Sequence, residues 1–417
     1  MIKIYKFGGS SLDSYEKIKN IAQQIKKREV NIIVVSAIGN TTDKIKKAVF
    51  GLEGDPFSIY KELQEDISLD SKTERKCNAI YKQFRRFLYS YKHVKSSLLE
   101  AALLVCGERL AAEFIKVAFQ NEGMEVESMD FYDKEFPLVV EGTPLNASIN
   151  LKLSRQRAEK LNLDKIIIIL PGFAGVDLEG NIRTLGRGGS DLAAMGYGYA
   201  FKAKEIWICT DVEGVKSAPP KIVKEAKTLP RISIEEAMDA AFFGAKLPST
   251  RTLEPLAKLY AEGFEPKCII ASSQNLEGER TEIVRETLGE HMIIAGRDVV
   301  RFSTKERNLH SIISQLIERN LDFFLIGTNR YFDLFVPEEF SNIIDLREGE
   351  NLYLAGVISS AIRAKRGVSA RASAALNNAG VNILYNVDPS KISMGFIIEK
   401  KEREACIRAL YSTFCDQ

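Results

Sequence analysis

A repeated local pattern constrains the fold of this chain more than any other feature of its sequence. In the first two-thirds, short aliphatic strands run into loops of glycine and hydroxyl residues, and each loop leads into a helix with apolar residues at helical spacing. The strand patterns occupy Ile2–Lys6, Asn31–Val35, Lys165–Leu170 and Glu205–Cys209. This alternation predicts a three-layer α/β fold, a mostly parallel sheet flanked by helices. The loops should converge at the carboxyl edge of that sheet, where open α/β sheets bind ligands.

Length and charge narrow the class of protein. A chain of 417 residues exceeds one usual core, and 58 basic against 56 acidic side chains leave a net charge of +2, which does not favour a nucleic-acid partner. The longest aliphatic run, Ile166–Leu170, is far too short to span a bilayer. Met1–Ile4 begins as a strand and not as a secretory signal. We therefore expect a cytoplasmic protein with neither a membrane nor a nucleic-acid partner.

Cysteine and histidine are used sparsely. The cysteines are scattered without a Cys-x-x-Cys pair, so we expect reduced thiols and no zinc site. His93, His291 and His310 all lie far from the glycine loops, which argues against a Ser/His/Asp or Cys/His hydrolase.

The stretch Thr184–Ala194, with the sequence TLGRGGSDLAA, is a candidate ligand loop. Its glycines allow close backbone approach, and the N–H groups that open a helix favour an anion. An ordinary structural interpretation also fits: a loop closed by glycines, an N-cap at Ser190, and an Arg187–Asp191 pair four residues apart. Taken alone, the motif leaves both interpretations open.

Four further motifs accompany this one. Lys6–Ser11, with the sequence KFGGSS, follows a strand and precedes a helix, although it lacks the spacing of a P-loop. The others, in chain order, are Ser36–Thr42, Gly107–Arg109 and, after the Arg187–Asp191 motif, Thr210–Val215. With these motifs in this order, the chain resembles the aspartokinases of the amino-acid kinase family nearly from end to end.

The resemblance implies transfer of the γ-phosphoryl group of ATP, bound with Mg²⁺, to the side-chain carboxylate of L-aspartate. The product, 4-phospho-L-aspartate, leads toward lysine, threonine and methionine. A carboxylate nucleophile is already ionised at pH 7, so it needs no general base. Catalysis then depends on positioning and on neutralisation of charge by fixed cations and backbone dipoles.

The resemblance also assigns roles to individual residues. Lys6 would lie near the transferring phosphoryl group, and Asp191 would orient Lys6. Arg187 would hold the α-carboxylate of aspartate, Glu108 would take its ammonium group, and three hydroxyl residues would complete the substrate site. Those hydroxyl residues are Ser36, Thr42 and Ser190. The nucleotide contacts would come from Gly8, Gly9, Ser10, Thr210, Asp211, Lys221 and Lys246, and no residue is assigned as a metal ligand.

Singly, these residues have ordinary explanations. Lys6 also fits an exposed lysine at a strand end, and Glu108 fits a first-turn glutamate stabilised by the helix dipole. The chain departs from the family pattern in two nucleotide loops, where Pro219 replaces an acidic residue and Ser249-Thr250 replaces His-Pro. We expect these changes to alter nucleotide affinity before they abolish chemistry.

After about Arg280 the glycine loops stop, and two shorter strand–helix–strand patterns resemble the paired ACT domains of the family. We therefore predict a catalytic domain over 1–285, with a helical insertion at about 55–102, and βαββ units over 290–345 and 346–417. Dimerisation through these units is expected, and an amino-acid effector is possible, although Arg307–Leu309 stands where the family has a Pro-Gly turn. The units could be sequential or interleaved.

Two other functions remain open. A sibling amino-acid kinase with another carboxylate substrate would share the fold and the lysine loop. A catalytically inactive relative that senses amino acids would keep the fold but lose ATP binding through its altered nucleotide loops.

Overall fold

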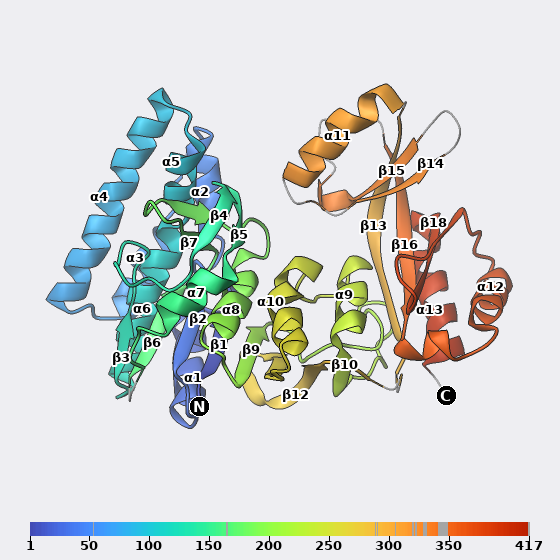
Figure 1. The fold of residues 1–417 in the computed structure, drawn as a ribbon, viewed down its shortest axis with the longest axis horizontal. Coiled ribbons are helices and arrows are strands. Elements are labelled where there is room, and N and C mark those ends of the chain that lie inside the picture. The colour runs from blue at the N-terminus through green and yellow to red at the C-terminus, as the bar shows by residue number, and fades with distance from the viewer. Residues whose placement is uncertain are drawn as a thin grey trace. The chain divides into compact units, whose positions relative to one another are not determined.

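The computed structural model describes residues 1–52, 54–163, 166–287, 289, 291–304, 306–318, 321, 323–327, 332–340 and 349–415. The chain forms two compact units (Figure 1). The first comprises Met1–Gly214 and Arg251–Glu282, and the second comprises Val215–Thr250 and Ile283–Gln417. Residues 215–250 therefore group with the C-terminal part of the chain, although the sequence motifs place them next to the kinase-like loops.

The first unit is built on a mostly parallel sheet, as the sequence predicts. Its strands, in spatial order, are β12 (Asn275–Val284), β11 (Lys267–Ser272), β9 (Glu205–Thr210), β1 (Lys3–Phe7), β2 (Ile32–Val35), β6 (Ile167–Pro171) and β3 (Val126–Ser128). Strand β1 is central and pairs in parallel with both β2 and β9, so that Ile4 lies opposite Ile32 and Ile206. The strand predicted at Lys165–Leu170 is observed at Ile167–Pro171, and Lys165 lies outside the described residues.

Helices cover this sheet, and two small hairpins lie beside it. The helices are α1 (Tyr15–Lys26), α2 (Thr41–Val49), α3 (Ser58–Asp66), α4 (Ser71–His93), α5 (Ser97–Leu104), α6 (Cys106–Asn121), α7 (Leu151–Ala158), α8 (Gly189–Ala200) and α10 (Thr250–Ala261). The hairpins are β4 (Val140–Thr143) with β5 (Asn146–Ile149) and β7 (Ala174–Val176) with β8 (Ile182–Thr184). Among the described residues, no helix combines the length and the apolar character that a bilayer span requires.

Helix α1 illustrates how the sequence sets these elements. The Ser14 hydroxyl caps the helix by accepting a hydrogen bond from the backbone N–H of Lys17. Ile18, Ile21 and Ile25 then recur at helical spacing and are fully buried. One face of α1 therefore packs into the core while the other stays polar.

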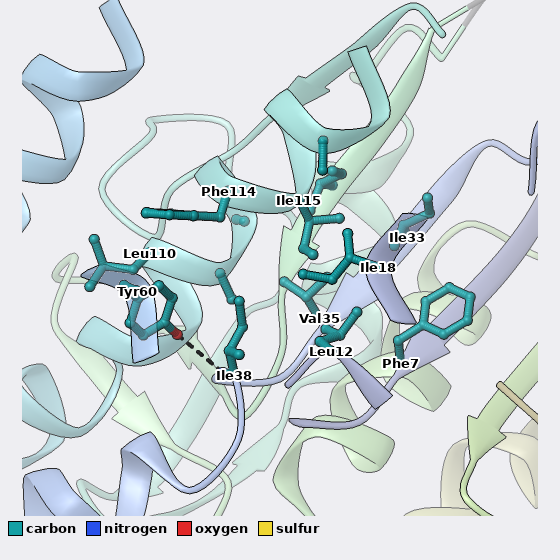
Figure 2. Close-up of a cluster of buried hydrophobic side chains, with 14 of the residues drawn as sticks. Phe7, Leu12, Ile18, Ile33, Val35, Ile38, Tyr60, Leu110, Phe114 and Ile115 are labelled. Carbon is teal, nitrogen blue, oxygen red and sulfur yellow. Dashed lines mark hydrogen bonds between the residues drawn. The ribbon is translucent and has the colours of Figure 1, made fainter. Parts of the chain in front are cut away.

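The alternation of side chains along β1 decides where its lysine points. Tyr5 and Phe7 belong to a buried cluster with residues of α1 and α6, which Figure 2 shows in close-up. Because successive side chains on a strand point to opposite faces, Lys6 lies on the other face of the sheet. That face is covered by α8, which packs against β1 and β9. The sheet itself thus directs Lys6 toward the start of α8.

The predicted helical insertion forms α3, α4 and α5 (Figure 1). Its apolar residues, among them Tyr60, Ile80 and Phe84, join the same buried cluster as α6. Helix α4 packs along α5 and α6, and its charged residues stay largely exposed. The insertion is therefore an integral part of the core of the first unit.

The second unit contains one antiparallel sheet. Its strands, in spatial order, are β14 (Phe324–Gly327), β15 (Phe332–Pro337), β13 (Ile293–Thr304), β16 (Glu350–Ile358), β18 (Ser393–Glu399) and β17 (Tyr385–Val387). The associated elements are β10 (Arg231–Ser233), α9 (Ile234–Phe242), α11 (Glu306–Glu318), α12 (Val368–Asn378) and α13 (Arg403–Phe414). The antiparallel strands and the helices between them agree with two ACT-like units.

Strand β13 is shared by the two predicted C-terminal units. It pairs with β16 over Ile293–Arg301 and with β15 over Val299–Thr304, so the two patterns are interleaved through one long strand (Figure 1). Helix α13, which the sequence patterns do not predict, packs against β13 and β16. The sequence over Asp322–Ile326 also has a strand pattern, which corresponds to β14, and Asp322 lies outside the described residues.

Residues 215–250 dock onto this sheet through one aromatic side chain. Gly356 on β16 and Gly395 on β18 are direct cross-strand partners, and the buried ring of Phe243 lies over both of them. A Cβ atom at position 395 would lie 2.7 Å from the Phe243 ring, and one at position 356 would overlap with it. Nearby, Glu236 at the start of α9 accepts hydrogen bonds from the backbone N–H (2.8 Å) and the hydroxyl (2.9 Å) of Ser360.

Candidate active site

An ion pair joins the central strand to α8. Lys6 Nζ lies 2.6 Å from Asp191 Oδ1, and the lysine side chain is 10% exposed. Asp191 stands in the first turn of α8, where a negative charge is favoured by the helix dipole. The alternative of an exposed strand-end lysine is therefore wrong: Lys6 is buried and held by a carboxylate at the carboxyl edge of the sheet.

The start of α8 differs from the N-cap that the sequence suggests. Gly188, with φ +68°, is the N-cap residue, and Ser190 is the second residue of the helix. Glycine is favoured here because an L side chain rarely adopts this left-handed conformation. Ser190 instead packs against the backbone of Gly172, where an added Cβ atom would come within 2.9 Å of Ser190 Cβ. Arg187, just before the cap, is exposed.

The loops after β1 and β2 meet at Ala37. A Cβ atom at Gly9 would overlap with the carbonyl oxygen of Ala37, and the backbone N–H of Gly39 donates to the Gly9 carbonyl at 3.0 Å. On its other side, Ala37 touches helix α6, because a Cβ atom at Gly107 would lie 2.6 Å from Ala37 Cβ. Three of the predicted motifs are thus in direct contact. Gly8 lies beside Lys6, since a Cβ atom there would be 3.5 Å from Lys6 Nζ.

Glu108 is the most unusual charged residue of this region. It is 2% exposed, and its Oε2 atom has no hydrogen-bond partner within the described structure. Burial raises the pKa of its carboxyl group to about 7, against the lowering effect of the backbone N–H groups of Glu108 and Ala37 and of the Lys46 charge. A buried carboxylate with an unused oxygen is suited to a cationic ligand.

The hydroxyl residues of the predicted substrate site divide by exposure. Thr41 is fully buried, and its hydroxyl donates to the Ile38 carbonyl at 2.7 Å, whereas the adjacent Thr42 is half-buried. This arrangement supports Thr42 over Thr41 as the residue available to a ligand. Ser36 is half-buried at the end of β2, and its N–H donates to the Phe7 carbonyl at 3.2 Å.

Phe173 lies against the start of α8, and the sequence patterns do not single it out. It adopts φ +68°, which is rare for a bulky side chain. Its carbonyl accepts a hydrogen bond of 2.7 Å from Leu185, and its ring lies against Gly189 at the start of α8. Backbone strain of this kind occurs often at functional sites. The flanking Gly172 and Gly175 are the only local signal in the sequence.

The predicted nucleotide residues belong to two different units. In the first unit, Thr210 ends β9 beside β1, its hydroxyl donates to Asp211 Oδ1 at 3.1 Å, and Ser10 is exposed after β1. Lys221 and Lys246 belong to the second unit, where both are exposed. Their part in binding a nucleotide stays a prediction, and so do the individual roles of the other site residues.

Comparison with known proteins agrees with this arrangement. Residues 1–272 match the Amino acid kinase family, and the chain belongs to that family. Several curated aspartokinases match this chain along 99% of its length. The aspartokinase of Pseudomonas aeruginosa is 26% identical, with 99% of this chain and 97% of that protein covered. The aspartokinase of Geobacillus stearothermophilus is 25% identical, with 99% and 97% covered.

Solved aspartokinases share the fold. Escherichia coli aspartokinase III, crystallised with aspartate and ADP, superposes with a TM-score of 0.79 at 19% identity, covering 99% of both chains. The aspartate kinase of Clostridium acetobutylicum gives a TM-score of 0.72 at 19% identity, with 99% of this chain and 100% of that chain covered. The predicted fold class, a kinase-like parallel sheet followed by ACT-like units, is therefore confirmed.

Proposed function

We propose that this chain is an aspartate kinase, which transfers the γ-phosphoryl group of ATP to the side-chain carboxylate of L-aspartate. The observation that carries the proposal is that neighbouring motifs of the first unit hold both a buried cation and a buried carboxylate. A buried cation, Lys6, is fixed by Asp191, while the buried carboxylate of Glu108 keeps an oxygen without a partner. The fixed cation suits a transferring phosphoryl group, and the buried carboxylate suits the ammonium group of an amino acid.

The reaction requires little from the protein except placement and charge. The aspartate carboxylate is ionised at neutral pH and attacks the γ-phosphorus directly, while ADP leaves. Lys6, held by Asp191, stabilises the negative charge that develops on the transferring group. Glu108 binds the α-ammonium group of the amino acid and Arg187 binds its α-carboxylate, because a carboxylate complements an ammonium group and a guanidinium fork complements a carboxylate. Ser36, Thr42 and Ser190 supply the remaining hydrogen bonds.

The nucleotide substrate is the magnesium complex of ATP, in which the metal neutralises phosphate charge. Within the described residues, no group of three or more His, Cys, Asp or Glu side chains is placed to hold a metal ion. Gly8, Gly9, Ser10, Thr210, Asp211, Lys221 and Lys246 are the proposed contacts to this substrate.

We further propose regulation and assembly through the second unit in a cytoplasmic homodimer. Escherichia coli aspartokinase III has also been crystallised with lysine and aspartate, and it superposes on this chain with a TM-score of 0.79 at 20% identity. An amino-acid effector of this chain would act through the interleaved ACT-like sheet.

The proposal is tested by measuring ADP release from magnesium ATP with L-aspartate, with L-glutamate as the control substrate. Hydroxylamine is included because it traps an acyl phosphate as a stable hydroxamate. We expect ADP release that depends on aspartate and an equal amount of hydroxamate. Turnover with glutamate alone would indicate a sibling kinase, and no turnover by folded protein would support the sensing function.

A further inference from the structure

The helical insertion places one tyrosine hydroxyl between two segments of the candidate substrate site. Tyr60 on α3 is fully buried, and its hydroxyl donates a hydrogen bond of 2.7 Å to the carbonyl oxygen of Gly107. The same hydroxyl accepts a hydrogen bond of 3.1 Å from the backbone N–H of Ile38, which Figure 2 shows as a dashed line. Burial raises the pKa of this hydroxyl well above its usual value, so it keeps the proton that it donates.

Both partners of Tyr60 lie next to residues of the proposed substrate site. Gly107 immediately precedes Glu108, and Ile38 lies in the loop between Ser36 and Thr42. The two segments also touch directly, because the missing side chain of Gly107 makes room for Ala37. Packing thus brings the segments together, and the Tyr60 hydroxyl sets their relative position through two directional bonds.

Tyr60 is itself held firmly. Its ring packs edge-on against Phe114 of α6, with the ring centroids 5.3 Å apart, and beside Phe57 at 6.3 Å. Phe57 in turn contacts Phe84 on α4 at 4.9 Å. The aromatic contacts extend from the insertion to the helix that carries Glu108, and Tyr60 is fully buried among them.

We propose that Tyr60 is a positioning residue for the amino-acid substrate, which fixes the spacing between Glu108 and the Ser36–Thr42 loop. This inference rests on the proposed aspartate kinase function. Tyr60 is fully buried, and its two hydrogen bonds go to backbone atoms of the protein. Its effect reaches the substrate through the two backbone segments that it joins.

The substitution Tyr60→Phe tests the inference, because it keeps the ring and removes both hydrogen bonds. Without these bonds, the Ser36–Thr42 loop would spend part of its time in conformations that cannot bind aspartate. The apparent affinity for aspartate would fall in proportion to the population of the binding conformation. We expect KM for aspartate to rise roughly fivefold to thirtyfold, as for the loss of a buried hydrogen-bonding group. We expect KM for ATP to change by less than about twofold. The Ile38 amide should exchange its hydrogen at least about fivefold faster.

Tyr81→Phe is the matched control. Tyr81 packs against Phe57 in the same aromatic group, with centroids 5.3 Å apart, but no described hydrogen bond links its hydroxyl to the two loops. It should leave both KM values and the Ile38 exchange rate unchanged. Gly107→Ala disturbs the same junction through packing and should also raise KM for aspartate selectively, which keeps the test open if Tyr60→Phe folds poorly.

The outcomes separate the inference from the function on which it rests. If the unaltered protein shows no aspartate-dependent turnover, the proposed function fails and the role of Tyr60 fails with it. If the unaltered protein turns over aspartate while folded Tyr60→Phe keeps its KM for aspartate, only the present inference is overturned. Equal increases in KM for aspartate and for ATP would also overturn it.

Discussion

Lys6 Nζ and Asp191 Oδ1 lie 2.6 Å apart, so the central strand and the first turn of α8 meet in an ion pair. The pair holds the lysine ammonium at the carboxyl edge of the sheet before any substrate arrives. Preorganisation of this kind is the main contribution that a protein makes to phosphoryl transfer. The predictions below follow from this pair, from the buried Glu108, and from the docking of Phe243.

The substitution Lys6→Ala should lower kcat at least ~100-fold, because it removes a preorganised cation from the developing negative charge. Steady-state kinetics with saturating aspartate and magnesium ATP measure the effect. Lys3→Ala is the control, since Lys3 lies on the same strand but pairs with Glu205 at its other end, 3.4 Å away. A Lys6→Ala enzyme with more than about a tenth of the normal kcat would contradict the proposed role.

The affinity for aspartate should fall as the pH drops below about 7, the pKa of Glu108. Below this pH a growing share of Glu108 is protonated and cannot pair with the substrate ammonium group. KM for aspartate should then approach a tenfold rise per pH unit, because only the ionised fraction binds. The measurement is KM for aspartate between pH 6 and pH 8. A flat profile, or an equal trend in KM for ATP, would exclude Glu108 as the cause.

The substitution Glu108→Gln should stabilise the folded protein at pH 8 while it weakens aspartate binding. The folded pKa of about 7 lies above the ordinary value of 4.5, so ionisation of Glu108 opposes folding. This destabilisation is absent below the unfolded pKa, grows as the pH rises toward the folded pKa, and reaches roughly 3 kcal/mol above it.

Urea-induced unfolding of Glu108→Gln and the unaltered protein at pH 5 and pH 8 checks the sign. The increase in the free energy of unfolding caused by Glu108→Gln should be larger at pH 8 than at pH 5. Glu135→Gln, which changes an exposed glutamate, should show little change at either pH. If the increase in stability does not vary with pH, ionisation of Glu108 does not destabilise the folded protein.

The substitution Gly356→Ala should destabilise the second unit by about 1–3 kcal/mol, the usual effect of overpacking. A methyl group there would overlap with the Phe243 ring. In a strand without such a contact, replacing glycine with alanine makes the protein more stable. The loss of stability expected here is therefore opposite in sign to the usual effect of this substitution. Thermal unfolding of Gly356→Ala, Phe243→Ala and the double variant measures the coupling. The loss from Gly356→Ala should shrink when Phe243 is removed, and an additive result would place the cause elsewhere.

Local sequence predicts the catalytic half of the fold well because each element carries its own signal. Strand β2 is a run of buried aliphatic residues, the loop before α8 holds Gly186 and Gly188 at positive φ, and Gly9 after β1 leaves no room for a Cβ atom. The alternation along β1 is also readable, since it turns Lys6 away from Tyr5 and Phe7. The ordered motifs therefore predict which loops share the site.

Long-range packing decides the features that the sequence does not reveal. The docking of residues 215–250 depends on a cross-strand glycine pair that lies far along the chain, and neither glycine has a local pattern that points to Phe243. The bridge from Tyr60 to Ile38 and Gly107 likewise joins segments that look unrelated in sequence. The N-cap of α8 is Gly188 in place of Ser190, and Ser190 contacts Gly172, which lies in a distant loop of the sequence.

The sharing of β13 limits how the chain can be divided or recombined. A fragment that ends near residue 345 would keep β13 but leave it without β16 along most of its length. A fragment that ends near residue 285 would keep Phe243 but lose the two glycines that cover its ring. Residues 215–250 and 283–415 must therefore be transferred together, and exchange of the ACT-like part between kinases requires three junctions in the chain, near residues 214, 250 and 282.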